Sequence, residues 1–353
     1  MKVAIITDQH FGARGDSVQC LDYYEKFYRD IFFPQLEEQD INHILILGDT
    51  FDRRKFVNFN TLSRAKRMFF DEAYVRGIMI TMIAGNHDTY FKNTNDVNSL
   101  DLTLAEYENI VIVTRPETVN VHETPICFLP WICADNYTDS MNEIKNTKAE
   151  ICMGHLEVAG FAMYRGAESH DGLSKDSFSK FDLVFSGHYH HKSDDGHIFY
   201  LGNPYELTWQ DYNDPRGFHI FDLSTRKLEF IQNTYSLFER CDYDDVSVGK
   251  DPDGIDPTYF TDKYVKIIVI NKTDLYKFDR FINRVYQSNP LDVKIVEDFS
   301  EFTEGEVDEN INLEDTSSVL SNYVDSLETD IDKEKIKSFM KSLYTEALNR
   351  DVA

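Results

Sequence analysis

The apolar positions along the first 225 residues form short runs, separated by turns or by amphipathic stretches. Runs of this length, rich in Val, Ile and Phe, are typical of buried strands. They lie at residues 3–7, 43–48, 78–85, 110–113, 125–130, 151–154, 182–187, 197–203 and 217–223. Early runs alternate with helix candidates at 20–39 and 61–77, which predicts βαβ units, whereas later runs follow one another closely, which predicts antiparallel additions. We therefore expect an α/β fold, a sandwich of mixed β-sheets flanked by helices.

The pattern changes after about residue 240. Residues 242–257 are acidic and rich in turn-forming residues, so we interpret them as a linker. Beyond them the order strand, helix, strand is enough for a small αβ cap domain. These expectations divide the chain into a main domain (1–235), a cap domain (236–297), an acidic tether (298–315) and a C-terminal helical segment (316–353).

Two amphipathic stripes mark the C-terminal segment, one short at 319–327 and one longer, with Asp332 as a candidate N-cap. The apolar residues of the longer stripe, at helical spacing, are Ile336, Phe339, Met340, Leu343, Tyr344, Ala347 and Leu348. Thirteen acidic residues and no basic residue lie between Glu297 and Asp332, which predicts a flexible tether before the stripe. Such helices either fold back onto their own domain or bind another protein through the apolar face.

Composition limits the possible partners and the compartment. The net charge of −26 has the wrong sign for a protein that coats nucleic acid by electrostatics alone. Any DNA contact therefore has to be local, assisted by bound cations or shared with a partner protein. No apolar run approaches the roughly 20 residues of a membrane span, and the N-terminus becomes polar too early for a signal peptide. The five scattered cysteines form no CxxC pair, so we expect a cytoplasmic protein with reduced thiols and no membrane contact.

Candidate metal ligands follow most of the early predicted strands. Three of the eleven histidines lie in the sequence GHYHH at 187–191, directly after an apolar run. The candidates at strand ends are Asp8, His10, Asp49, Asn86, His87, Asp88, His155, His188 and His190. Because the carboxyl ends of neighbouring strands share one crevice in an open α/β sheet, these side chains can converge although they are far apart in the sequence.

The spacing and the donor types narrow the chemistry. In Asp8-x-His10 and His188-x-His190 the ligands stand at i and i+2, and on extended backbone they point to the same side. Carboxylates and imidazoles without thiolates suit Mn²⁺, Fe²⁺ or Zn²⁺ rather than a structural cysteine site. Each pair alone is weak evidence, because a lone HxH is more often a solvated loop than a metal site.

The ordered motifs D-x-H, GDxxDR, GNHD, GH and GHxH together resemble the signature of the calcineurin-like metallophosphoesterase superfamily. They are matched at 8–10, 48–53, 85–88, 154–155 and 187–190. Within that superfamily the chain is similar to SbcD-type DNA repair and recombination nuclease subunits, those of T-even phages among them. The resemblance is detailed to about residue 225 and only architectural beyond it. One position departs from some archaeal and eukaryotic relatives, which have His where this chain has Asp52, so their exonuclease detail is not carried over.

This resemblance implies two divalent metal ions, with Asp49 as the carboxylate that bridges them. The first ion would be held by Asp8, His10, Asp49 and His190, and the second by Asp49, Asn86, His155 and His188. Mn²⁺ is the expected ion, with Mg²⁺ and Fe²⁺ as alternatives. The family also assigns His87 to stabilising the scissile phosphate or protonating the leaving oxygen, and we expect the Asp52 carboxylate to orient its ring.

The clearly basic stretch, residues 53–76, has seven basic residues against two acidic ones. Arg53, Arg54 and Lys55 leave the metal crevice and would contact DNA phosphates without reading sequence, while a solvated helix face is the alternative. In the resembling nucleases, helices near here also form a homodimer interface. Its candidate apolar contacts in this chain are Leu62, Met68, Phe69 and Phe70.

We expect a two-metal-dependent DNA nuclease that acts with an SbcC-like ATPase, as a homodimer within a heterotetramer, in double-strand-break processing and recombination. The alternative is a stand-alone phosphatase or phosphodiesterase that acts on a small molecule or a phosphoprotein. The cap, the tether and the terminal helices argue against this alternative, because a stand-alone phosphatase does not need them. A non-catalytic scaffold should have lost ligands, yet every motif position is filled.

Overall fold

The computed structural model describes residues 1–164, 167–169, 172–247 and 254–297, together with 333, 335 and 337. A single compact unit extends from Met1 to Glu297. The acidic tether and the apolar residues of the C-terminal stripe lie outside the described residues. Within the described part, no helix combines the length and the apolar character needed to cross a membrane.

One six-stranded sheet carries the N-terminus of the chain. In sheet order its strands are β14 (Leu228–Gln232), β13 (Gly217–Asp222), β1 (Lys2–Ile6), β2 (His43–Ile46), β3 (Met79–Ile83) and β4 (Ile110–Val113). The strands β1 to β4 are parallel, and β13 and β14 are added to them in antiparallel pairing. This confirms a mixed sheet whose parallel part comes first in the sequence.

A second six-stranded sheet is built in the same way. Its strands are β11 (Ser193–Asp194), β12 (Ile198–Tyr200), β10 (Leu183–Ser186), β7 (Ile151–Gly154), β6 (Thr124–Leu129) and β5 (Glu117–Val121). The four inner strands are parallel, and both edge strands are antiparallel to their neighbours. The sequence did not predict β5, β11 or β14, because these edge strands are short or carry few buried residues.

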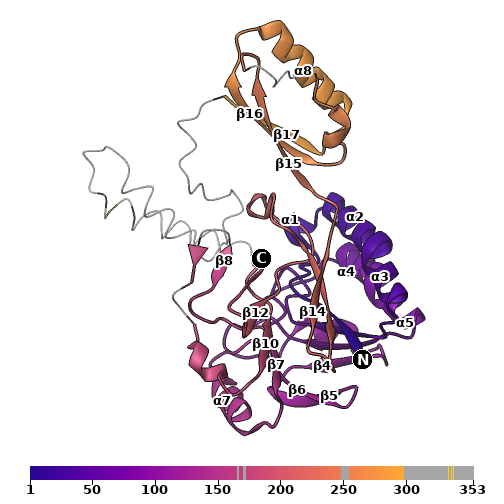
Figure 1. The fold of residues 1–353 in the computed structure, drawn as a ribbon, viewed down its shortest axis with the longest axis vertical. Coiled ribbons are helices and arrows are strands. Elements are labelled where there is room, and N and C mark those ends of the chain that lie inside the picture. Colours follow the sequence, from indigo (N-terminus) through magenta and orange to yellow (C-terminus); the bar gives the residue numbers. More distant parts are fainter. Residues whose placement is uncertain are drawn as a thin grey trace. The chain divides into compact units, whose positions relative to one another are not determined.

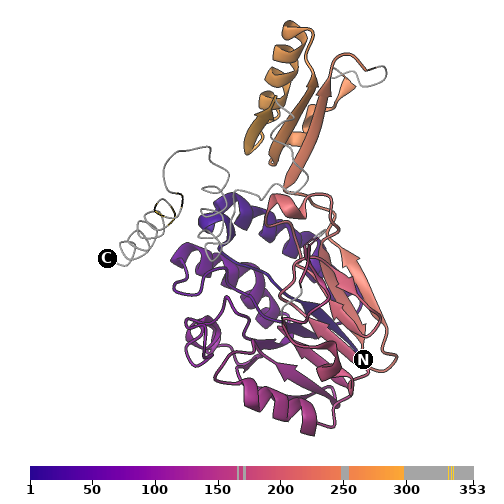
Figure 2. The same ribbon diagram turned by 90° about the vertical axis from the view of Figure 1, so that its left-hand side faces the viewer.

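Alternate residues of the central strands belong to different cores, because successive side chains of a strand point to opposite faces. In β1, Val3 and Ile5 pack with Phe128 of the second sheet, whereas Ala4 and Ile6 pack in the core that contains the helices. The two sheets therefore lie face to face with helices outside them, as in Figures 1 and 2. This is the expected sandwich.

Helices cover the outer faces of both sheets (Figure 1). Those on the first sheet are α1 (Ala13–Asp16), α2 (Val18–Phe27), η1 (Tyr28–Phe32), α3 (Phe33–Glu38), α4 (Phe59–Ala65), η2 (Lys66–Phe70), α5 (Asp71–Val75) and α6 (Ser99–Leu104). The helix α7 (Tyr137–Asn146) packs on the second sheet through Ile144. Both predicted helices are confirmed, each with a π-helical segment in its middle. Short 3₁₀ turns lie at η3 (Lys175–Phe178), η4 (Trp209–Asp211) and η6 (Pro257–Phe260).

A third, three-stranded parallel sheet has its own core. Its strands are β15 (Phe238–Asp244), β16 (Tyr264–Asn271) and β17 (Asp292–Val296), and the helix α8 (Leu275–Gln287) packs on them. Elsewhere in the chain, β8 (Ala162–Tyr164) and β9 (Ala167–Glu168) form a separate antiparallel pair. The predicted order strand, helix, strand is confirmed by β16, α8 and β17. The predicted linker at 242–257 is wrong at its start, because β15 alternates acidic residues with the buried Cys241 and Tyr243.

The proposed apolar dimer contacts are contradicted for three of their four residues. Phe69 and Phe70 are completely buried and Met68 is 5% exposed, all within the core under the first sheet. These side chains stabilise the fold and are not accessible to a second copy. The large apolar side chains exposed nearby instead include Phe56, Phe59, Tyr74 and Val75.

Candidate metal centre

The loops that follow β1 and β2 run side by side and bring the first two motifs together. The amide of Asp8 donates to the carbonyl of Gly48 at 3.0 Å, and the amide of His10 donates to that of Asp49 at 3.0 Å. Asp8, His10 and Asp49 all have positive φ, as does His188. The expectation of extended backbone at these motifs is therefore wrong, and spacing alone does not determine which cluster a ligand joins.

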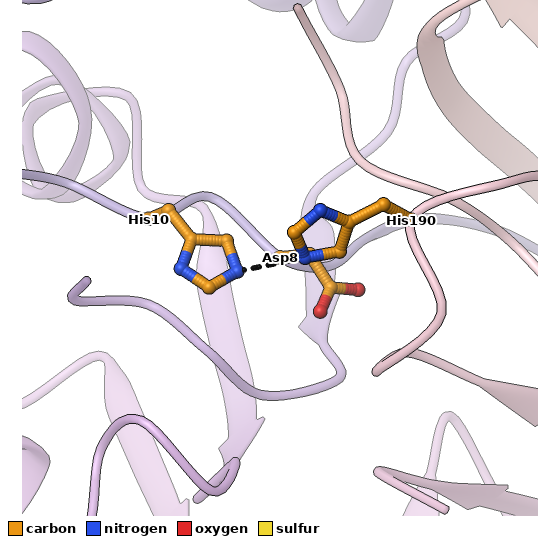
Figure 3. Close-up of side chains that lie close together, drawn as sticks. All are labelled: Asp8, His10 and His190. Carbon is orange, nitrogen blue, oxygen red and sulfur yellow. Dashed lines mark hydrogen bonds between the residues drawn. The ribbon is translucent and has the colours of Figure 1, made fainter. Parts of the chain in front are cut away.

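Asp8, His10 and His190 form the first cluster, and their candidate ligand atoms lie within 4.8 Å of one another. Figure 3 shows the two imidazole rings turned toward each other, with Nε2 of His10 3.1 Å from Nε2 of His190. Asp8 and His10 are buried and His190 is half-buried. Two ring nitrogens and a carboxylate that converge in this way are a suitable donor set for a divalent cation.

Asp49, His155 and His188 form the second cluster. Nε2 of His155 lies 2.9 Å from Oδ1 of Asn86, and Nδ1 of His188 lies 3.0 Å from the same oxygen. The cluster thus offers oxygen and nitrogen donors from four different loops. His188 and His190, although only two residues apart, belong to different clusters.

One carboxylate oxygen faces both clusters. Oδ2 of Asp49 lies 3.7 Å from Nε2 of His10 and 3.3 Å from Nε2 of His155. The other oxygen, Oδ1, accepts a hydrogen bond from the amide of His87 at 2.8 Å, which holds the carboxylate in place. The structure therefore gathers the six other predicted ligands around Asp49.

Two glycines allow the loops to approach this closely. A Cβ at Gly48 would overlap the ring of His155, and a Cβ at Gly85 would overlap the carboxylate of Asp49. Gly48 also has a φ of +92°, which a residue with a side chain rarely adopts. Gly48 and Gly85 are thus each required by a ligand that belongs to another motif.

Asp88 has a structural role rather than that of a candidate ligand. Its carboxylate accepts hydrogen bonds from the amides of Gly85, Thr50 and Phe51 at 2.9–3.1 Å. Burial and the nearby charge of Asp49 raise the pKa of Asp88 to about 6, although these three amides oppose the shift. The side chain fastens the GNHD loop to the loop that carries Asp49.

The expected pairing of the Asp52 carboxylate with His87 is wrong. Nδ1 of His87 lies 2.5 Å from the main-chain carbonyl of Asp52, to which it donates, so its Nε2 is left for the site. The Asp52 carboxylate instead lies 3.3 Å from Nδ1 of His10. A carboxylate behind a histidine of this kind fixes the tautomer and raises the basicity of a metal ligand.

A buried arginine supports the GHYHH loop from behind, and it was not predicted from the sequence. The guanidinium of Arg216 donates to the carbonyl of His190, and its other terminal nitrogen pairs with Asp211 at 2.7 Å and Asp214 at 2.8 Å. Asp214 in turn lies 2.7 Å from Nδ1 of His191. The signal in the sequence for this role was the position of the arginine, between the turn residues 213–215 and an apolar strand.

The cluster histidines differ in charge when no metal is bound. Burial alone would lower the pKa of both His10 and His155. At His10 the carboxylates of Asp52 and Asp49 outweigh the effect of burial and raise the pKa to about 9. At His155 the carboxylate of Asp49 has the same effect, and the pKa again rises to about 9. Burial and the neighbouring His155 lower the pKa of His188 to about 3. Burial opposes ionisation of Asp49, yet the cationic His155 and its neighbours hold the pKa of that carboxyl well below its usual range.

We expect the metal affinity to rise with pH. His10 and His155, with pKa values of about 9, are protonated at neutral pH, and each ring must lose its proton before it binds an ion. The affinity of each site should increase by up to about tenfold per pH unit below pH 9 and then level off. The same raised pKa values also stabilise the metal-free fold. This stabilisation is complete at pH values below the pKa of about 6.5 that a histidine has in the unfolded chain, and it is lost as the pH rises through 9.

Calorimetric titration of the metal-free protein with Mn²⁺, in buffers of different ionisation enthalpy, measures this proton release. Affinity independent of pH between 7 and 9, with no protons released, would contradict the protonation states described above.

Most of the basic residues on the helices are already neutralised by acids. Arg64 pairs with Asp22 and Glu25, and Lys66 pairs with Glu106. This part of the basic stretch therefore fits the alternative interpretation, a solvated helix face. At its start, Arg53 lies 3.2 Å from Asp16 and over the ring of the exposed Phe56. Lys55 is exposed and Arg54 is half-buried.

The convergent site and the two-sheet sandwich are those expected of a calcineurin-like phosphoesterase, and comparison with known families gives the same class. Residues 1–192 match the calcineurin-like phosphoesterase family, and the chain belongs to it. It is 31% identical over 355 residues to exonuclease subunit 1 of Enterobacteria phage T4, covering 98% of this chain and 99% of that protein. It is also 22% identical over 261 residues to the SbcD component of the nuclease SbcCD of Staphylococcus epidermidis, covering 65% of this chain and 67% of that protein.

Family membership makes the chain a metal-dependent phosphoesterase, and therefore a hydrolase that uses divalent cations. The donor atoms described above fit such cations, because buried carboxylate, amide and imidazole groups converge with no thiolate among them.

Proposed function

We propose that the protein is a two-metal-dependent DNA nuclease that hydrolyses phosphodiester bonds. The observation that supports two ions is the position of Asp49 Oδ2, within 3.7 Å of a ring nitrogen in each of the two clusters. The DNA substrate is supported by the two relatives, both of which are named as nucleases.

The ligand roles in this proposal follow the two clusters. The first ion would be held by Asp8, His10, Asp49 and His190, and the second by Asp49, Asn86, His155 and His188. When bound, such ions activate water and neutralise charge on the phosphate oxygens. Mn²⁺ is the proposed ion, with Fe²⁺ and Mg²⁺ as alternatives, and the mixed oxygen and nitrogen donors are compatible with such cations. Asp52 orients the ring of His10, and Arg216 positions the carbonyl of His190.

His87 is the proposed catalytic acid. Its Nδ1 is fixed on the Asp52 carbonyl and its amide on Asp49, so the ring is held at the edge of the first cluster, 4.9 Å between centroids from His10. In the cationic form, Nε2 carries the proton that a departing alkoxide needs, or stabilises charge on the phosphate.

The function is tested by adding Mn²⁺ to the metal-free protein and following hydrolysis of linear duplex DNA beside that of p-nitrophenyl phosphate. Mn²⁺-dependent shortening or nicking of the DNA is expected. Rapid hydrolysis of the monoester with intact DNA would contradict the proposal and favour the stand-alone phosphatase. Both arms are repeated with an SbcC-like ATPase present.

Neutralising Arg53, Arg54 and Lys55 together should weaken DNA binding alike for all sequences and flatten its salt dependence. Each lost phosphate contact reduces the slope of log K against log salt by about 0.9 for duplex DNA. The matched control is neutralisation of Lys66, Arg67 and Arg76, which are paired with acidic neighbours. Fluorescence anisotropy at several salt concentrations measures both slopes, and an unchanged slope in the first variant would exclude these residues from the DNA contact.

The proposed partner is an SbcC-like ATPase, within a heterotetramer that contains two copies of this chain and acts on double-strand breaks in the cytoplasm. Both relatives are named as subunits of a larger enzyme. The apolar stripe from Ile336 to Leu348 is the proposed contact, since helix-in-groove binding uses apolar anchors at this spacing.

A chain that ends at residue 311 should therefore stay folded and bind metal but no longer co-purify with the ATPase. Thermal unfolding and metal titration are the controls for the retained unit, Met1–Glu297. Full partner affinity in the shortened chain would show that the stripe is not the contact.

A further inference from the structure

A small pocket adjoins the second cluster and has no role in the proposed ligand and acid assignments. Its volume is about 160 Å³, and it is lined by Trp131, Ile132, Tyr137, His155, Glu157, Gly172 and Leu173. His155 belongs both to the pocket wall and to the metal centre. A ligand in this pocket therefore lies beside a histidine of the metal centre.

The walls of the pocket are mainly aromatic and aliphatic, with His155 and Glu157 as the ionisable residues among them, and Trp131 is its largest aromatic residue. The Trp131 ring lies 5.1 Å between centroids from His188 and 6.2 Å from His155. Its carbonyl accepts hydrogen bonds from the side-chain amides of Asn95 and Asn136, both at 2.9 Å. These bonds fix the backbone of Trp131, and the ring contacts place its indole beside the metal-centre histidines.

We infer that this pocket receives the base of the nucleotide whose phosphate lies at the metal centre. The inference rests on the proposed nuclease function and adds to that function a binding site for the base. A cavity of roughly 150 Å³ with apolar walls is large enough for one benzene ring, so this pocket matches the six-membered ring of a base. Bases bind aromatic side chains by stacking without regard to sequence, because each has a π-face.

A base inside a duplex does not reach such a pocket, since it is stacked and paired on both sides. The nucleotide at the site therefore has to be unpaired, at a frayed end or splayed out of the helix, at a cost of a few kcal/mol that is lowest where pairing is already lost. The structure thus assigns to this enzyme a preference for phosphodiesters beside unpaired nucleotides.

The pocket has a built-in reporter, because the chain has two tryptophans and Trp209 lies elsewhere, against Phe238. In the full-length Trp209→Phe variant the fluorescence comes from Trp131 alone. At saturating Mg²⁺, which is not paramagnetic, thymidine 5′-monophosphate should quench this fluorescence in a saturable way. Deoxyribose 5-phosphate and inorganic phosphate, which have no base, should leave it unchanged.

Equal quenching by deoxyribose 5-phosphate would overturn the inference, because it would show that the phosphate alone perturbs the indole. Stronger quenching by O-phosphotyrosine than by the nucleotide would also overturn it, in favour of a phosphoprotein substrate.

Kinetics give a second readout, the ratio of kcat/KM for the p-nitrophenyl ester of thymidine 5′-monophosphate to that for methyl p-nitrophenyl phosphate. Stacking on one aromatic side chain corresponds to about 5- to 100-fold in affinity, so Trp131→Ala should lower this ratio by that factor. Trp131→Phe should restore most of it, and the control Trp209→Ala should leave it unchanged. If the protein cleaves DNA but Trp131→Ala leaves the kcat/KM ratio unaltered, the base pocket is overturned and the nuclease function is not. Failure of the proposed nuclease function would be seen separately, as intact DNA in the Mn²⁺ assay.

Discussion

Replacing Asp49 with Asn should abolish cleavage, with a fall of roughly 10³-fold or more. Oδ2 of Asp49 is the oxygen that faces both clusters, so its loss removes a ligand from both proposed ions at once. Metal ions contribute several kcal/mol of transition-state stabilisation, and each 1.36 kcal/mol corresponds to tenfold in rate. The same change leaves the cationic His10 and His155 without their common counter-ion in the metal-free protein.

Calorimetric titration with Mn²⁺ should show the loss of at least one of two binding events in Asp49→Asn. Thermal unfolding in EDTA separates this effect from misfolding, and Asp101→Asn, in a residue that contacts the N-cap of α6, is the conservative control. Two intact binding events in Asp49→Asn would show that the carboxylate does not bridge the ions.

His87→Ala should cleave DNA about 10²- to 10⁴-fold more slowly while it binds both metals and DNA nearly normally. General acid catalysis has this magnitude, and the His87 ring is fixed by the Asp52 carbonyl rather than by any of the proposed ligands. Asp52→Asn should also slow cleavage, by a smaller factor of about 10 to 100, because its carboxylate supports the ligand His10 from behind.

His188→Ala is the matched comparison, since His188 contacts Asn86 within the second cluster and its loss should lower metal occupancy. Single-turnover cleavage and metal titration of both variants separate the two roles. If His87→Ala loses a metal ion, this residue is a ligand, and undiminished cleavage would exclude it from the mechanism.

The convergence of the site could be predicted from the sequence because its cause is topological. Asp8 and Asp49 follow neighbouring parallel strands of the first sheet, and His155 follows a parallel strand of the second sheet. The strands themselves are visible as apolar runs. The two layers of sheet could be predicted for the same reason. Edge strands such as β5 were missed, because a strand with one buried residue in five has no clear apolar run.

The orientation of individual side chains could not be predicted from spacing. A left-handed backbone at Asp8, His10 and His188 redirects side chains that an extended chain would align. The carboxylate of Asp52 faces His10 because the chain turns between the strand end and α4, and nothing in the motif GDxxDR specifies that turn. Arg216 lies far from the motifs in sequence, so its bond to the His190 carbonyl becomes visible only in the folded chain.

Burial also decides between interpretations that the sequence leaves equal. Apolar residues on a basic helix are compatible with a core or with a dimer interface, and Phe69 and Phe70 belong to the core. Trp131 follows a predicted strand and resembles an ordinary apolar residue in the sequence, whereas the structure places its ring beside the metal-centre histidines.

The central claim is that one carboxylate joins two metal sites, and anomalous diffraction from crystals loaded with Mn²⁺ tests it most directly. We expect two anomalous peaks roughly 3.5 to 4 Å apart, one beside His10 and His190, the other beside His155 and His188, with Asp49 between them. A single peak, or two peaks that Asp49 does not connect, would contradict it.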